Sequence, residues 1–167
     1  MTRTAYTFEL KNDLSELDRL CQNCETVGES LGLSKKLTFE MNLALDELFT
    51  NIISYGFADE KEHVIKIDIV AENNELRMRI EDDGIPFDPV IAEEPNLECR
   101  IEECRIGGLG IHLIKNLMDE IRYERLNDVN ILYLKKHIPS ADTTGGKGKH
   151  KKRKHLPSDG HCMRDDE

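Results

Sequence analysis

Residues 45–55 read LDELFTNIISY, and they continue an apolar stripe with helical spacing that begins several residues earlier. Ser34 suits the N-cap of a helix and Gly56 suits the residue after its last turn, so we predict one helix between them. Glu47 and Asn51 stand one turn apart on a face away from this stripe. The apolar stripe comprises Leu37, Met41, Ala44, Leu45, Leu48 and Ile52.

Alternating apolar residues on both sides of this helix predict strands and tight turns. The pair Asn73-Asn74 separates two such runs and is typical of a two-residue hairpin turn. The predicted order is a strand at 4–10, helices at 13–32 and 34–55, strands at 65–69 and 76–80, a loop at 86–106, a helix from Gly108, and strands at 119–126 and 129–137.

Hairpin strands with segregated helices predict an α+β fold, a two-layer α/β sandwich. A doubly wound parallel sheet would need a helix between successive strands, and the hairpins leave no room for one. We expect one domain over residues 1–139, followed by a basic and disordered tail over 140–167.

Composition limits the classes of function. The net charge is -10 over 167 residues, and an acidic protein repels nucleic-acid phosphate, so we expect no direct nucleic-acid partner. No apolar run approaches the ~18 residues of a membrane span, and no secretory signal is apparent, so a cytoplasmic protein without a membrane partner is expected. The five cysteines are an odd number, which argues against a disulfide framework. Cys21 and Cys24 are predicted to be buried thiols on a helix.

Two polar patterns are candidates for chemistry. A carboxylate and an amide oxygen one turn apart, at Glu47 and Asn51, can hold magnesium or its water ligands, and Glu47 can serve as a general base. Asp82 lies at the end of a predicted strand, where it could accept a hydrogen bond from a base, and Gly84 would let a ligand approach the backbone. Taken singly, the first pattern also fits a solvated helix face and the second fits a simple turn.

A glycine-rich loop is the third candidate. Gly107, Gly108, Leu109 and Gly110 lead directly into a predicted helix, whose N-terminal amide groups favour an anion such as phosphate. Arg105 could add positive charge there. A flexible hinge is the plainer interpretation of this loop, and the chain contains no G-x-x-x-x-G-K-[ST] phosphate loop.

The three candidates occur in an informative order: E-x-x-x-N on a helix, D-x-G at a strand end, then G-G-L-G before a helix. In this combination residues 4–137 resemble the GHKL (Bergerat) ATPase superfamily. The resemblance is to its anti-sigma factor serine/threonine kinases, also called switch-protein kinases. The stretches that carry it are 45–55 (LDELFTNIISY), 81–89 (EDDGIPFDP), 107–119 (GGLGIHLIKNLMD) and 130–136 (NILYLKK).

The resemblance implies a histidine-kinase-like ATPase fold with a mixed, mostly antiparallel sheet and helices on one face. It implies ATP and Mg²⁺ as cofactors, Glu47 as catalytic base and metal ligand, and Asn51 as a magnesium ligand. It further implies that Asp82 contacts the adenine amino group beside Gly84. Arg105 and the Gly107, Gly108, Leu109 and Gly110 loop would then border the phosphates, with 87–106 as a lid.

The resemblance also implies the partners. We expect an ATP-dependent protein serine/threonine kinase whose substrate is an anti-sigma-factor antagonist, with sequestration of a sigma factor as a second role and a homodimer as a possible state. The main alternative is a non-catalytic ATP-binding module that controls a partner protein. A detached histidine-kinase domain is a third interpretation, which Ser54 weakens because histidine kinases often carry Lys at that place.

Overall fold

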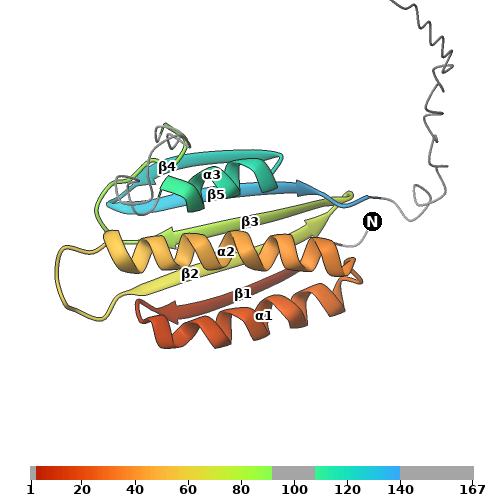
Figure 1. The fold of residues 1–167 in the computed structure, drawn as a ribbon, viewed down its shortest axis with the longest axis horizontal. Coiled ribbons are helices and arrows are strands. Elements are labelled where there is room, and N and C mark those ends of the chain that lie inside the picture. Colours follow the sequence, from red (N-terminus) through yellow and green to blue (C-terminus); the bar gives the residue numbers. More distant parts are fainter. Residues whose placement is uncertain (1–2, 92–107, 140–167) are drawn as a thin grey trace, which may run out of the picture.

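The computed structural model describes residues 3–91 and 108–139. In these residues, one sheet carries three helices on one face (Figure 1). The elements are β1 (Thr4–Lys11), η1 (Leu14–Glu16), α1 (Leu17–Ser30), α2 (Lys35–Tyr55), β2 (Val64–Glu72), β3 (Glu75–Asp82), α3 (Gly108–Leu117), β4 (Glu120–Leu126) and β5 (Val129–His137). The predicted two-layer α+β fold is confirmed.

The strand order in the sheet is β1-β2-β3-β5-β4, and every one of these pairings is antiparallel. The sheet of the described residues therefore lacks the mixed character that the resemblance implied. The two hairpins account for the antiparallel pairing of β2 with β3 and of β4 with β5, because each joins strands that are neighbours in both sequence and space. The turn residues Asn73, Asn74, Asn127 and Asp128 all have positive φ, which Asn and Asp tolerate better than other non-glycine residues.

The pairing of β3 with β5 positions the site, because it joins distant parts of the chain. Its register places Asp82 opposite Asn130 and Glu75 opposite His137. Asp82 and Asn130 therefore lie at the same end of the sheet, and His137 lies at the other end. In Figure 1 this first end, where β3 finishes, is also the end where α2 finishes and α3 begins.

Helix α2 lies between α1 and α3 over the sheet, and its apolar face fills the core. The Ser34 side chain accepts a hydrogen bond from the Leu37 amide, and the Gly56 amide bonds the Ile52 carbonyl, so both predicted helix ends are confirmed. Phe49, which lies outside the predicted stripe, is nevertheless fully buried. Figure 1 shows α2 flanked on both sides, which explains why its buried face is wider than one narrow stripe.

Helix α1 differs from the prediction at its start. The Asp13 side chain caps a short 3-10 turn by accepting a hydrogen bond from the Ser15 amide, and α1 itself begins only at Leu17. The change of helical pitch turns Leu14 outward, with 51% of its surface exposed.

The two cysteines of α1 differ in burial. Cys24 is buried as predicted, and burial raises the pKa of its thiol to about 12, whereas Cys21 is only half-buried. No helix in the described part of the chain is long and apolar enough to cross a membrane.

Candidate functional site

The first half of the site lies where α2 meets the first turn of α3. A Cβ atom built on Gly110 would overlap Glu47 Oε2 and would lie 3.2 Å from Asn51 Nδ2. A larger residue at this position would therefore displace the Glu47 carboxylate from the place it occupies beside α3. The structure thus brings together three of the predicted site residues, and it places the Glu47 carboxylate at a helix N-terminus, where negative charge is favoured.

The orientation of the Asn51 amide determines which atom faces a ligand. Its Nδ2 donates a hydrogen bond of 2.7 Å to the Glu47 carbonyl oxygen, one turn earlier. This bond uses the donor end of the side chain, so Oδ1 is the atom available to a cation or its water. A carboxylate and an amide oxygen are ligands that Mg²⁺ prefers.

The donor set is consistent with magnesium held jointly by protein and nucleotide. No group of three or more His, Cys, Asp or Glu side chains suited to a metal ion occurs among residues 3–91 and 108–139. Magnesium in phosphate-transfer sites usually takes one or two protein ligands and completes its shell with phosphate oxygens and water. Glu47 and Asn51 fit that kind of site.

Helix α3 is fixed at its other end by Lys136. The Lys136 ammonium donates to the Leu117 carbonyl at the end of α3 and pairs with Glu40 of α2 at 3.3 Å. These side chains are mostly shielded from solvent, so water screens the contact less than it would a surface pair. Lys136 thereby joins β5, α2 and α3, and it helps to aim the N-terminus of α3 at Glu47.

The second half of the site is built around Asp82, the last residue of β3, which is only 8% exposed. Burial raises the pKa of its carboxyl, and hydrogen bonds from Asn130 and from the Gly84 amide oppose that rise. Asn130 Nδ2 and the Gly84 amide both donate to Oδ1, at 2.8 and 2.9 Å. Because both bonds end on Oδ1, Oδ2 is the atom left to accept a hydrogen bond from a ligand.

Asn130 holds the Asp82 carboxylate, and the sequence analysis did not single it out. Its Oδ1 accepts hydrogen bonds from the Tyr123 hydroxyl at 2.8 Å and from Arg125 Nη1 at 2.7 Å. Two donors on Oδ1 force the amide nitrogen toward Asp82, so the Asn130 side chain can have only one orientation. Arg125 Nη1 also donates to the Gly84 carbonyl at 3.0 Å, which ties the turn after β3 to β4.

The turn after β3 packs against the end of α2. The Ile85 amide donates to the Gly56 carbonyl at 2.7 Å, and a Cβ atom on Gly84 would overlap that same carbonyl oxygen. Gly84 is therefore required for this close packing against the end of α2. Its predicted role, to let a ligand approach the backbone, stays a prediction. Glu47 and Gly56 are nine residues apart on α2, so the two halves of the site are separated by about 14 Å along the helix axis.

Four predicted residues remain without a described side-chain environment. Arg105 and Gly107 lie outside the described residues, together with most of the segment expected to form a lid. Gly108 and Leu109 form the start of α3, but only their backbone is described.

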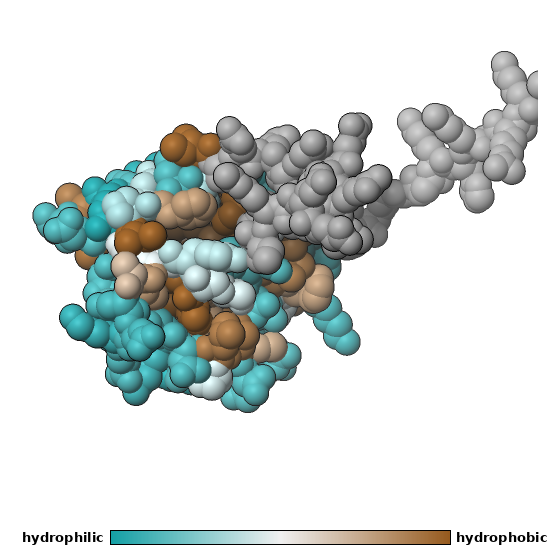
Figure 2. Space-filling model, turned by 60° about the vertical axis from the view of Figure 1, so that its left-hand side comes forward, coloured by the Kyte–Doolittle hydropathy of each residue, from teal (hydrophilic) through white to brown (hydrophobic). Residues whose placement is uncertain are grey.

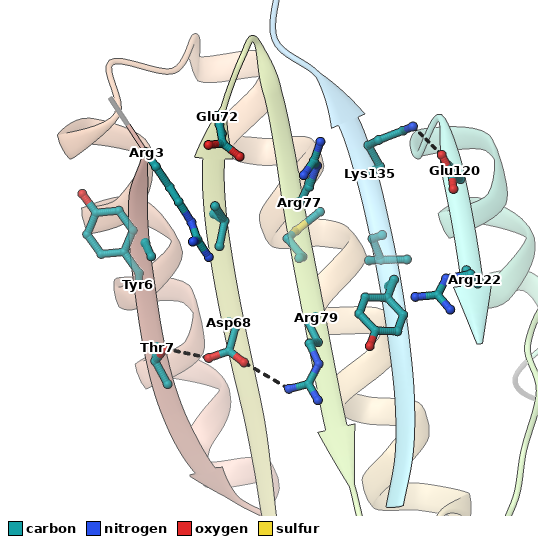
Figure 3. A pocket seen from close by; sticks show the side chains of 15 residues that line it. Arg3, Tyr6, Thr7, Asp68, Glu72, Arg77, Arg79, Glu120, Arg122 and Lys135 are labelled. Carbon is teal, nitrogen blue, oxygen red and sulfur yellow. Dashed lines mark hydrogen bonds and ion pairs between the residues drawn. The ribbon is translucent and has the colours of Figure 1, made fainter. Parts of the chain in front are cut away.

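A hollow on the opposite face of the sheet is separate from this site. It has a volume of about 720 Å³, and Figure 3 shows hydrogen bonds and ion pairs between some of its polar side chains. Asp68 accepts from Thr7 at 2.6 Å and from Arg79 at 3.4 Å. The Arg122 guanidinium stacks over the Tyr133 ring at 4.2 Å. Alternation along β3 turns Arg79 to this face and Asp82 to the helix face, so the hollow shares none of the site residues.

The fold and the two-part site define a class of protein. Residues 10–136 match the family model described as "Histidine kinase-like ATPase domain", and the chain belongs to this family. Its members have the ATPase domain to which the sequence analysis pointed, so the predicted superfamily is confirmed.

The curated relatives narrow this class. The chain is 30% identical to the serine/threonine-protein kinase BtrW of Bordetella bronchiseptica over 62% of this chain and 73% of that protein. It is 26% identical to the serine-protein kinase RsbW of Listeria monocytogenes over 65% and 72%, respectively. It is also 26% identical to the anti-sigma F factor of Geobacillus kaustophilus over 59% and 68%. These names confirm the predicted resemblance to serine/threonine kinases of the anti-sigma type.

A solved structure supports the fold alone. A crystal structure of the RsbU and RsbW domains of a Mycobacterium tuberculosis protein superposes with a TM-score of 0.57 at 12% identity. The match covers 81% of this chain but only 32% of that longer chain.

Proposed function

We propose that this chain is an ATP- and magnesium-dependent protein serine/threonine kinase that phosphorylates an anti-sigma-factor antagonist and also binds a sigma factor. The kinase and anti-sigma names of its relatives support this proposal. The observation that carries it is the contact of the Glu47 carboxylate with the first turn of α3 at Gly110.

Each part of the site has a role in the proposed reaction. Asp82 Oδ2 would accept a hydrogen bond from the adenine amino group, and the N-terminus of α3 would face the phosphates. A magnesium ion held by Glu47 and Asn51 would supply positive charge to the phosphate oxygens. Glu47 would accept the proton of the attacking serine hydroxyl, directly or through a water molecule. Asn51 has no basic group, so its contribution is limited to holding the metal and the nucleotide.

A protein substrate is supported by the surface beside the site. Figure 2 shows the side of the molecule where α2 ends. On this side, hydrophobic patches, drawn in brown, interrupt a mostly hydrophilic surface, drawn in teal. Large exposed apolar side chains occur at the last residue of α2, Tyr55, and in the segment that follows Asp82. The latter are Ile85, Phe87, Val90 and Ile91. Exposed apolar side chains beside a site are typical of a protein-docking surface, and a docked protein would bury them.

The test is single-turnover transfer of labelled γ-phosphate to a purified antagonist encoded beside this chain. Glu47→Gln should keep most of its ATP affinity and lose about 10²- to 10⁴-fold in transfer rate, the usual contribution of a general base. Asn51→Ala should lose magnesium-dependent binding and transfer together. Asp46→Asn is the matched control, because residue 46 points about 100° away from residue 47 on a helix.

The outcomes separate catalysis from binding. If Glu47→Gln transfers phosphate at the wild-type rate, Glu47 is not the base. If the wild-type chain binds ATP but phosphorylates no candidate antagonist, the non-catalytic ATP-binding module becomes the better description.

A further inference from the structure

A histidine outside the predicted site lies between two carboxylates. His63 precedes β2, and only 16% of its side chain is exposed. Its Nε2 lies 2.7 Å from Asp59 Oδ1, and its Nδ1 lies 2.9 Å from Asp83 Oδ1. The Phe57 ring stacks on the imidazole, with ring centres 4.2 Å apart and planes inclined by 17°. The ring is thus held on both edges and one face.

This geometry selects the protonated form of His63. A neutral imidazole has one N–H and one unprotonated nitrogen, so it can donate to only one of the two carboxylates. The imidazolium donates to both. The hydrogen bond with Asp59 is the largest cause that raises the pKa of His63, and the contact with Asp83 adds to it.

The main chain at His63 is anchored to the end of β1. The His63 amide donates to Asn12 Oδ1 at 2.8 Å, and the Asn12 amide donates back to the His63 carbonyl at 3.0 Å. Asn12 Nδ2 also donates to the Lys61 carbonyl at 3.0 Å. The imidazole therefore stands on a fixed base rather than on a loose loop.

Asp83 connects this anchored imidazole to the adenine side of the site. Asp83 directly follows Asp82 in the sequence. The next two residues are Gly84, whose amide donates to Asp82 Oδ1, and Ile85, whose amide donates to the Gly56 carbonyl oxygen. A restraint on Asp83 is therefore a restraint on the turn that sets the Asp82 carboxylate.

We propose that His63 is a positioning residue for nucleotide binding, and that its protonated ring clamps the turn after β3 through Asp83. The inference rests on the proposed ATP site. The clamp joins the loop after α2, the end of β1 and the turn after β3.

The sign of the pH effect follows from the contacts. The charged groups facing the ring are Asp59 and Asp83, with Lys61 near Asp59 at 3.6 Å. The pKa of His63 is raised by the folded structure, so the clamp is complete below the ordinary imidazole pKa of 6.5. It is lost as the pH rises through the raised value, because the neutral ring can no longer donate to both carboxylates.

The size of the effect is modest because Asp83 is 58% exposed. An exposed ion pair usually contributes between a few tenths and one kcal/mol, which corresponds to about a two- to fivefold change in affinity. We therefore expect ATP to bind about two- to fivefold more weakly at high pH, beyond any change that the nucleotide itself contributes.

The experiment measures Mg-ATP affinity by calorimetry between pH 6 and pH 9 for the wild type and His63→Gln. Phosphate groups titrate in this range as well, so only the difference between the two profiles counts. Asp83→Asn should also flatten the profile. His137→Gln is the matched control, because it removes a histidine at the other end of the sheet. Thermal melts at each pH exclude unfolding.

A second readout needs no nucleotide. The NMR amide signals of Gly84 and Ile85 should shift with the titration of the His63 ring in the wild type, and this shift should vanish in His63→Gln. Identical affinity profiles and identical amide titrations in the two proteins would overturn the clamp while leaving the ATP site intact. A wild-type chain that binds no nucleotide at any pH would overturn both proposals.

Discussion

Replacing Asp82 with Asn should have opposite effects on stability and on nucleotide binding. Oδ1 of Asp82 accepts from Asn130 Nδ2 and from the Gly84 amide. An asparagine can keep both bonds by placing its own Oδ1 in the same position, and its Nδ2 then takes the place of the carboxylate Oδ2. The substitution leaves the hydrogen-bond network intact and removes a buried negative charge.

The stability effect follows from the pKa of Asp82, which burial raises above its ordinary value of 3.8. A raised carboxyl pKa means that the folded state favours the protonated form, so ionisation costs stability as the pH rises through the folded value. Asp82→Asn should therefore be at least as stable as the wild type at neutral pH. The advantage should disappear at acidic pH, where Asp82 is neutral as well. Thermal melts across the pH range measure this difference.

The binding effect has the opposite sign. The new amide nitrogen would point a donor at the adenine amino group, which is also a donor, so a hydrogen bond is lost and both groups remain unpaired. The cost should be about 1–3 kcal/mol, or ~5- to 150-fold in affinity for ATP. Inosine triphosphate, whose base has an oxygen in place of that amino group, should lose much less or should gain affinity. Calorimetry with both nucleotides gives the ratio.

Two results would refute this reasoning. Equal ATP affinity in the wild type and Asp82→Asn, with no change in preference for inosine triphosphate, would remove Asp82 from the adenine site. A loss of several kcal/mol in stability at neutral pH would show that the network around Asn130 requires the negative charge.

Two further substitutions test the remaining contacts. Gly110→Ala should weaken Mg-ATP binding by ~10-fold or more, because its Cβ would overlap the Glu47 carboxylate, although alanine slightly favours helix α3. The control is Gly28→Ala, whose Cβ would overlap the Thr38 side chain between α1 and α2. This control should lower the melting temperature and leave the nucleotide affinity of the folded protein unchanged. Unchanged binding by Gly110→Ala would mean that α3 can withdraw from Glu47 at no cost. Asn130→Ala removes the charge-assisted hydrogen bond to Asp82 and should lower stability by about 2–4 kcal/mol and also weaken ATP binding. The control is Asn116→Ala on the exposed side of α3, which should change neither property. Equal melting curves for the two variants would contradict the role given to Asn130.

Residues whose surroundings are set by nearby sequence could be predicted. Ser34 caps α2 because a serine before an apolar helical stripe has a local amide to bond. The Asn73-Asn74 turn is equally local, since two residues with positive φ are enough to reverse the chain. Glu47 and Asn51 share a face for the same reason: helical geometry alone aligns residues four apart.

Asn130 and His63 could not be predicted in this way, because their partners are far away in the sequence. Asn130 meets Asp82 only through the register of β5 on β3, 48 residues apart. A signal was present: Asn130 occupies an inward position in the alternation of β5, where a polar residue requires a partner. His63 meets Asp83 across 20 residues, and no local pattern marks it.

The two halves of the site differ in how they are held, and this has a consequence for regulation. Asp82 is fixed by a buried network from β5 and β4, whereas Glu47 depends on the placement of α3, which is held at one end by Lys136. A protein partner that shifts α3 would therefore change the proposed catalytic half of the site, at Glu47, while leaving the proposed adenine half, at Asp82, in place. A change in His63 would act on the adenine half alone. Partner binding should accordingly alter the rate of phosphate transfer more than nucleotide affinity, and pH should alter nucleotide affinity more than the rate at saturating ATP.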